Sequence, residues 1–145
     1  MKTIGATEIS LILLIFLPGI LYLRTLSGVL KKCSTQNRKM PPNQVWLLLI
    51  PLFNLVWQFV VMSKISDSLR KEYRERNITF KGDMGEAVGL FFCISIIIHI
   101  LATASGTAFM ILPTIVLWII HWVKISAFTI VLSHKPISQN PASIE

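Results

Sequence analysis

Four long apolar stretches occupy most of this chain, at residues 9–30, 43–62, 87–104 and 107–132. Because a helix rises about 1.5 Å per residue, each stretch can cross or nearly cross a hydrocarbon layer about 30 Å thick. Hydrophobic residues make up 53% of the 145 residues, so little sequence remains for a separate water-soluble domain. The sequence therefore predicts an all-helical membrane protein with four transmembrane helices in one domain, residues 1–132.

Proline residues and changes in composition set the expected boundaries of the helices. Pro18 should bend the first helix, because proline removes a backbone donor and crowds the preceding turn. A polar, proline-containing segment follows the last helix and should be disordered. The predicted elements are helices at about residues 8–30, 43–76, 84–104 and 107–132, and a tail at 133–145.

The second helix is expected to continue past the membrane surface as a cytoplasmic amphipathic segment over residues 63–76. Apolar residues recur there every three or four positions, with charged residues on the other faces. Glu72 and Arg76 are an i,i+4 pair, which is typical of a solvated, ion-paired helix surface. The third helix has a start signal in Asp83 and Glu86, which resemble a capping box.

The charge distribution is compatible with two topologies. With four spans and both termini in the cytoplasm, nine Lys and Arg residues lie inside and five outside, and Cys33 lies outside. If residues 43–62 instead form a re-entrant hairpin hinged at Pro51, with the N-terminus outside, the count becomes 13 to 1. A single proline usually kinks a membrane helix without reversing it. The prediction is therefore the four-span arrangement, and the hairpin is the alternative.

Several polar residues fall inside the predicted membrane helices. Asn54, Ser95 and Thr114 are expected at similar depth, near the middle of the membrane. His99 and His121 belong to the same polar set but should lie at different depths, so they are not expected to share a metal ion. These side chains either join neighbouring helices by hydrogen bonds or line a path for water or ions.

Small residues and charges near the membrane boundary suggest how the helices pack. Gly85, Gly89 and Cys93 lie on one line of the third helix, where small side chains allow a close approach to another helix of the chain or of a second copy. Glu8 and Lys124 both fall near the cytoplasmic boundary in the four-span arrangement. They are expected to form an ion pair.

Composition argues against several classes of function. The membrane helices carry no mid-membrane Asp or Glu, which proton-coupled transporters usually need. No nucleophile and base occur in a recognisable catalytic spacing, so neither an enzyme nor a cofactor is expected. The net charge of +7 lies in segments that flank apolar helices, where Lys and Arg meet anionic lipid headgroups. Nucleic-acid binding is therefore not expected.

Two stretches of the chain resemble a known group of proteins. Residues 33–76 contain Asn37-Arg38-Lys39-Met40, the run WLLLIPLFN at 46–54, and Ser68-Leu69, while residues 118–124 have the pattern Trp-x-x-x-Trp-x-Lys. These segments resemble the membrane half of uncharacterised bacterial proteins, some of which carry an added GYF-like domain. The resemblance implies a small helical domain of the bacterial inner membrane and implies no activity.

The expected function is that of an integral membrane interaction or assembly protein. Its partners would be the lipid bilayer and either another membrane protein or a second copy of the chain. The alternative is a homo-oligomeric pore, channel or membrane-disrupting effector. A single copy with four kinked helices is too small to enclose a water-filled pore, so oligomeric state separates the two hypotheses.

Overall fold

The computed structural model of the chain describes residues 5–106 and 111–135, without the side chains of residues 6–9 and 11–15. Every regular element in this described part is helical, as the sequence predicts. The elements are α1 (Ala6–Lys32), the 3-10 helix η1 (Pro42–Leu49), α2 (Pro51–Glu75), α3 (Glu86–Ala104) and α4 (Ile111–His134).

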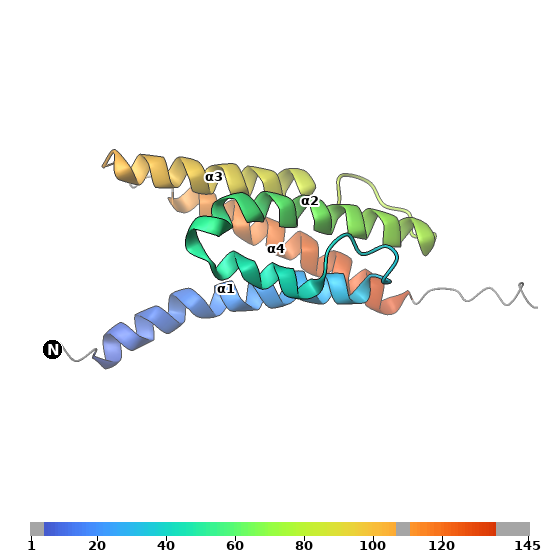
Figure 1. The fold of residues 1–145 in the computed structure, drawn as a ribbon, viewed down its shortest axis with the longest axis horizontal. Helices are drawn as coiled ribbons and strands as arrows, with labels where there is room; N and C mark the ends of the chain where they lie inside the picture. Colours follow the sequence, from blue (N-terminus) through green and yellow to red (C-terminus); the bar gives the residue numbers. More distant parts are fainter. Residues whose placement is uncertain (1–4, 107–110, 136–145) are drawn as a thin grey trace, which may run out of the picture.

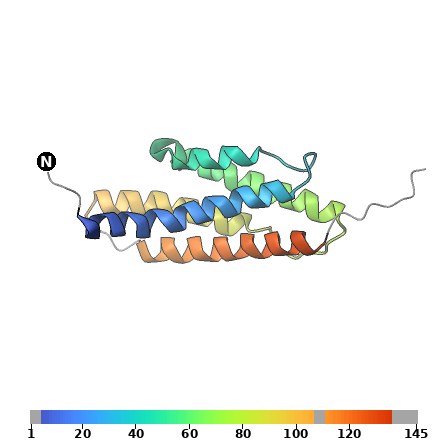
Figure 2. The same ribbon diagram turned by 90° about the horizontal axis from the view of Figure 1, so that it is seen from below.

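The helices form an elongated bundle in which α1, α2 and α4 run in one direction and η1 and α3 run in the other (Figure 1). Helix α4 packs against α1 and α3, while α2 packs against α3 and η1. Figure 2 shows η1 and α4 on opposite sides of α1. Helix α1 continues through Pro18, and its first turns bend away from the bundle.

The predicted second helix is broken into a hairpin, so a continuous helix over residues 43–76 is wrong. Ile50 has an extended backbone, with φ −85° and ψ 111°, and α2 starts at Pro51. A residue before proline is sterically disfavoured in the helical region, which lets the chain reverse here. The Trp57 Nε1–H donates to the Gln44 carbonyl oxygen at 2.9 Å and holds η1 against α2. Residues 42–75 therefore form a helical hairpin hinged at Pro51, the fold that the alternative prediction requires.

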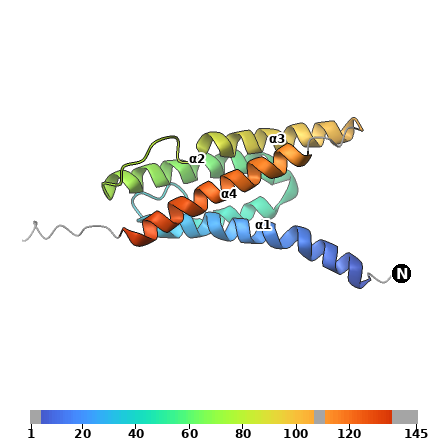
Figure 3. The ribbon, with the colours of Figure 1, turned by 180° about the vertical axis from the view of Figure 1, so that it is seen from behind.

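The reversal brings together two segments that the four-span arrangement separates, the loop after α1 and the C-terminal half of α2. The Lys39 backbone N–H donates to Ser68 Oγ at 2.8 Å, and Gln36 Nε2 donates to Glu75 Oε1 at 2.6 Å. Residues 33–41 therefore lie beside the C-terminal half of α2. Helix α1 begins at one end of the bundle and α4 finishes at the other (Figures 1 and 3). The four-span prediction places residues 33–41 and the C-terminal half of α2 on opposite sides of the membrane, and the two termini on the same side. The structure differs from it in both respects.

The outside of the bundle is strongly apolar. Two helices of the described part, α3 and α4, are long and apolar enough to cross a membrane, with mean hydropathies of 2.4 and 2.0. Most of their residues face outward, and so does the tip of the hairpin, where Leu52 is 85% exposed. Soluble monomers rarely expose so much contiguous apolar surface. These helices indicate association with a membrane.

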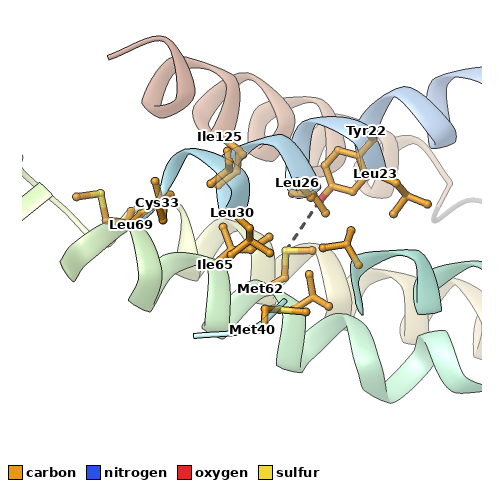
Figure 4. Packing of buried hydrophobic residues seen from close by; sticks show 14 of the residues in the cluster. Tyr22, Leu23, Leu26, Leu30, Cys33, Met40, Met62, Ile65, Leu69 and Ile125 are labelled. Carbon is orange, nitrogen blue, oxygen red and sulfur yellow. Dashed lines mark hydrogen bonds between the residues drawn. The ribbon is translucent and has the colours of Figure 1, made fainter. Parts of the chain in front are cut away.

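The buried core lies toward the end at which α2 and α4 finish (Figure 4). Leu26 and Leu30 of α1 are fully buried there, and Ile65 and Leu69 of α2 and Ile125 of α4 are equally enclosed. At 3.6 residues per turn, these spacings of three or four keep each apolar set on one face of its helix. The core therefore joins α1, α2 and α4 independently of any surrounding lipid.

Helix α3 approaches its neighbours most closely at Gly89. A Cβ atom there would lie 2.9 Å from His121 Nε2 and 3.1 Å from Met62 Cγ. Gly85, which precedes α3, and Cys93 are also buried. Within the predicted line of small residues, Gly89 is therefore a close contact inside the chain, against α4 and α2.

Replacing Gly89 with Ala should destabilise the bundle, because the added methyl group overlaps the imidazole ring of His121. We expect a loss of about 1–3 kcal/mol, the usual effect of overpacking. Thermal unfolding of the purified protein in detergent measures it. Gly28→Ala is the matched control, since a Cβ atom at Gly28 meets nothing within 4 Å. Equal melting temperatures for the two variants would contradict the close contact.

Candidate functional site

One end of the bundle holds a network of polar side chains, here called the polar cap, made of Ser34, Asn37, Arg38, Glu72 and Arg76. Glu72 is fully buried, and its Oε2 accepts hydrogen bonds from the Ser34 N–H at 2.8 Å, Ser34 Oγ at 2.9 Å and Asn37 Nδ2 at 2.9 Å. Arg76 Nη2 lies 2.7 Å from Glu72 Oε1. The predicted Glu72–Arg76 pair is confirmed, but it is buried and not on a solvated surface.

Arg38 completes the C-terminal end of α1. Its Nε donates to the Leu30 carbonyl oxygen at 2.7 Å, and its Nη2 donates to the Cys33 carbonyl oxygen at 3.1 Å. The last carbonyl groups of a helix lack partners within the helix and carry partial negative charge. A guanidinium group supplies both the hydrogen-bond donors that these carbonyl groups lack and a positive charge that balances their partial negative charge.

Arg76 performs the same task for α4 and joins α4 to α1. Its Nη1 donates to the carbonyl oxygens of Leu132 at 2.8 Å and Lys135 at 2.6 Å, and its Nη2 donates to that of Lys32 at 3.0 Å. Helix α4 thus continues to His134, beyond the predicted end at residue 132. Residues 136–145 of the predicted tail lie outside the described residues.

The network also sets the ionisation of its members. Burial raises the pKa of Glu72, but the hydrogen bonds from Asn37, Ser34 and Arg76 outweigh it and hold the pKa below its usual value. Burial, assisted by the nearby Glu72 carboxylate, raises the pKa of Cys33 to about 12. Glu72 is therefore ionised at neutral pH, and the Cys33 thiol is protonated and unreactive.

A second feature is a pocket of about 290 Å³ on the side of the bundle, here called the lateral pocket. Its lining is mainly apolar. The residues that define it are Gly19 and Tyr22 of α1, Leu49 of η1, Asn54 and Gln58 of α2, Phe92 of α3 and Trp118 of α4. Gln58 is only 3% exposed, and its Nε2 has no hydrogen-bond partner within the described part of the chain. Buried amides usually are hydrogen-bonded, so this one requires an explanation.

Tyr22 and His121 form a buried pair next to the lateral pocket. Tyr22 Oη and His121 Nδ1 lie 2.8 Å apart and share a hydrogen bond. Tyr22 Oη also lies 3.9 Å from Met62 Sδ, the contact drawn in Figure 4. His121 therefore lies between α1 and the Gly89 segment of α3, where it holds the helices together.

The structure brings only part of the predicted polar cluster together. Thr114 Oγ1 donates to the Ser95 carbonyl oxygen at 3.4 Å, whereas Asn54 lines the lateral pocket. His99 is half-buried on α3, about 15 Å along the helix from the segment that meets His121. The two histidines are separate, as predicted. In the described part of the chain, no group of three or more His, Cys, Asp or Glu residues could hold a metal ion.

Lys124 pairs with a residue other than the predicted Glu8. Its Nζ lies 3.9 Å from Asp83 Oδ1, and Asp83 also accepts hydrogen bonds from the backbone N–H groups of Gly85 and Ala87 at the start of α3. Burial raises the pKa of Asp83, but these backbone donors and Lys124 lower it overall. The side chain of Glu8 lies outside the described residues. Helix α3 begins at Glu86 with Gly85 at its N-cap position, so the predicted start at residue 84 and the capping box of Asp83 with Glu86 are wrong. Asp83 nevertheless accepts hydrogen bonds from backbone N–H groups at the start of α3.

Sequence reasoning named Asn54 and the Glu72–Arg76 pair, but it missed Gln58 in the lateral pocket and the loop residues that bind Glu72 in the polar cap. Asn54 and Gln58 are four residues apart in an apolar run, so their shared face of α2 was a usable signal. The partners of Glu72 gave none, because Ser34 and Asn37 approach it only after the chain has reversed at Pro51.

Comparison with models of protein families, with curated proteins and with solved structures finds no match to this chain. The resemblance of residues 33–76 to bacterial membrane proteins therefore stays a prediction. What the chain does has to be argued from the polar cap and the lateral pocket.

Replacing Glu72 with Gln should loosen the polar cap, because the neutral amide loses the charge-assisted bonds. We expect a local loss of about 1–3 kcal/mol, seen as faster hydrogen exchange of the residue 33–39 backbone at pH 7. Glu86→Gln is the control and should change this exchange little, because Glu86 lies at the start of α3 and pairs with Arg70. Equal exchange in the two variants would contradict the account.

The stability that Glu72 supplies should also depend on pH. Its pKa is lowered in the folded protein, so its contribution is complete above the unfolded value of about 4.3 and is lost as the pH falls through the folded pKa. Native exchange, corrected for intrinsic rates, should therefore accelerate in residues 33–39 below about pH 4. The Glu72→Gln variant, in which residue 72 no longer titrates, should not show this acceleration of exchange. If the acceleration persists in the variant, another titrating group causes it.

Proposed function

We propose that this chain is a non-catalytic integral membrane protein that acts as an interaction or assembly component. In this proposal α1, α3 and α4 cross the bilayer, and the η1–α2 hairpin enters it from one side. The apolar run at residues 9–23 supports the crossing by α1. The outward-facing apolar residues of the other two helices support theirs.

The orientation follows from the basic residues. Every Lys and Arg except Lys2 lies after Leu23, in segments that meet at or near the polar cap. By the positive-inside rule this end faces the cytoplasm, so α1 begins on the opposite side and α4 finishes inside. Exposed lysines such as Lys31, Lys64 and Lys71 would meet anionic headgroups of the inner membrane.

One observation favours an assembly role over a pore. The polar side chains at membrane depth with hydrogen bonds join helices to one another or to their own backbone: Tyr22 with His121, Trp122 with Thr25, and Thr114 with the backbone of Ser95. Groups used in this way stabilise packing. In the assembly role, the partner of this chain would be another membrane protein or a second copy of the chain.

The proposed topology predicts which sides of the membrane single cysteines label from. Thr35→Cys and Thr79→Cys, both at exposed positions, should react from the cytoplasmic side, and Ser105→Cys from the opposite side. The native Cys33 and Cys93 are buried and provide the unlabelled background. An impermeant thiol reagent applied to intact cells and to inverted vesicles measures this. Opposite sidedness for residues 35 and 79 would restore the four-span arrangement.

An assembly protein and a pore differ in permeability. Liposomes that contain the purified protein and a trapped ion-sensitive dye should take up ions no faster than protein-free liposomes, because the bonded polar groups do not line a water path. A robust flux that Asn54→Leu abolishes would identify a homo-oligomeric pore and overturn the proposed role.

A further inference from the structure

The lateral pocket combines an apolar lining with a buried, unpaired amide. Gln58 Nε2 has no hydrogen-bond partner among the described residues, although the side chain is 3% exposed. Leaving a buried donor unsatisfied is unfavourable, because the group has lost its hydrogen bonds to water and gained none in the protein. A ligand that presents a hydrogen-bond acceptor in the pocket would remove this penalty.

The position of the pocket entrance indicates the route by which such a ligand would enter. Phe16 and Leu49 stand on the rim and are 60% and 52% exposed, on the apolar exterior of the bundle. Gln58 precedes Lys64 by six residues and so lies about 9 Å deeper along α2 than that exposed charge. The acceptor therefore has to arrive through the hydrocarbon layer, on a molecule dissolved in the bilayer.

The lining specifies the shape of the ligand. Tyr22, Phe92 and Trp118 contribute aromatic surface from three helices, which favours a flat ring. Asn54 lies one helical turn from Gln58 on the same face of α2, with about 5–6 Å between their Cβ atoms. Two amides at this spacing match two carbonyl oxygens on opposite sides of a six-membered ring.

We propose that the lateral pocket binds a flat, bilayer-soluble carbonyl compound of the quinone class, with a carbonyl oxygen accepting a hydrogen bond from Gln58 Nε2. The volume of about 290 Å³ is near the lower limit for small-molecule sites and suits a single substituted ring. The proposal rests on the proposed insertion of the η1–α2 hairpin into the bilayer, concerns binding alone and is independent of the assembly role.

Duroquinone and durene test the proposal as a matched pair, because both are flat six-membered carbon rings with four methyl groups and only duroquinone has carbonyl oxygens. Binding of each to the full chain in lipid nanodiscs is measured by equilibrium dialysis and corrected with empty nanodiscs. The native protein should bind duroquinone about tenfold more tightly than durene, the effect of one buried hydrogen bond. In Gln58→Leu the ratio should fall to about one. Equal affinities in the native protein, or a ratio unchanged in the variant, would overturn the proposal.

A second variant keeps the test valid if Gln58→Leu folds poorly. A Cβ atom at Gly19 meets nothing within 4 Å, so Gly19→Leu can fill the pocket without a clash and should abolish duroquinone binding. Gly28→Leu, in the same helix and with the same free space, lies away from the pocket and should bind as the native chain does. Binding by Gly19→Leu equal to that of Gly28→Leu would place the ligand elsewhere and refute the site.

Discussion

The arrangement of this bundle depends on the hydrogen bonds and the ion pair that surround the buried carboxylate of Glu72. A charge enclosed by protein is strongly unfavourable unless several donors surround it. Glu72 has these donors in Ser34, Asn37 and Arg76, which belong to a distant loop and to its own helix. Arg76 in turn binds the last carbonyl groups of α1 and α4. One carboxylate thereby organises the ends of three helices and the loop between two of them.

The hairpin and the lateral pocket follow from this constraint. Because the polar cap holds residues 33–41 beside the C-terminal half of α2, the intervening chain has to enter the bundle and return. The extended backbone of Ile50 before Pro51 supplies the reversal. The returning α2 then packs beside η1 and α1, and these helices border a space that the unpaired amide of Gln58 lines. A single straight helix over residues 43–76 would form neither feature.

Sequence reasoning succeeded where the signal was local and failed where it depended on the direction of distant segments. The apolar runs predicted the helices, and Gly89 predicted where α3 packs closely, because each effect acts within a few residues or one helix face. Pro51 gives the same local signal for a kink and for a reversal, although the more asymmetric charge count favoured the hairpin. The pairing of Lys124 depends on the alignment of whole helices, which no short pattern contains.

The distance between residues 36 and 75 tests the polar cap and the hairpin together. Spin labels on Gln36→Cys and Glu75→Cys in nanodiscs report it directly, because the native side chains of these exposed residues are hydrogen-bonded at 2.6 Å. Dipolar broadening of the continuous-wave spectrum detects a short distance, and double electron–electron resonance detects a long one. The account predicts a single short distance, well under the hydrocarbon thickness of about 30 Å. A distance equal to or greater than that thickness would place the two segments on opposite sides of the membrane and contradict the account.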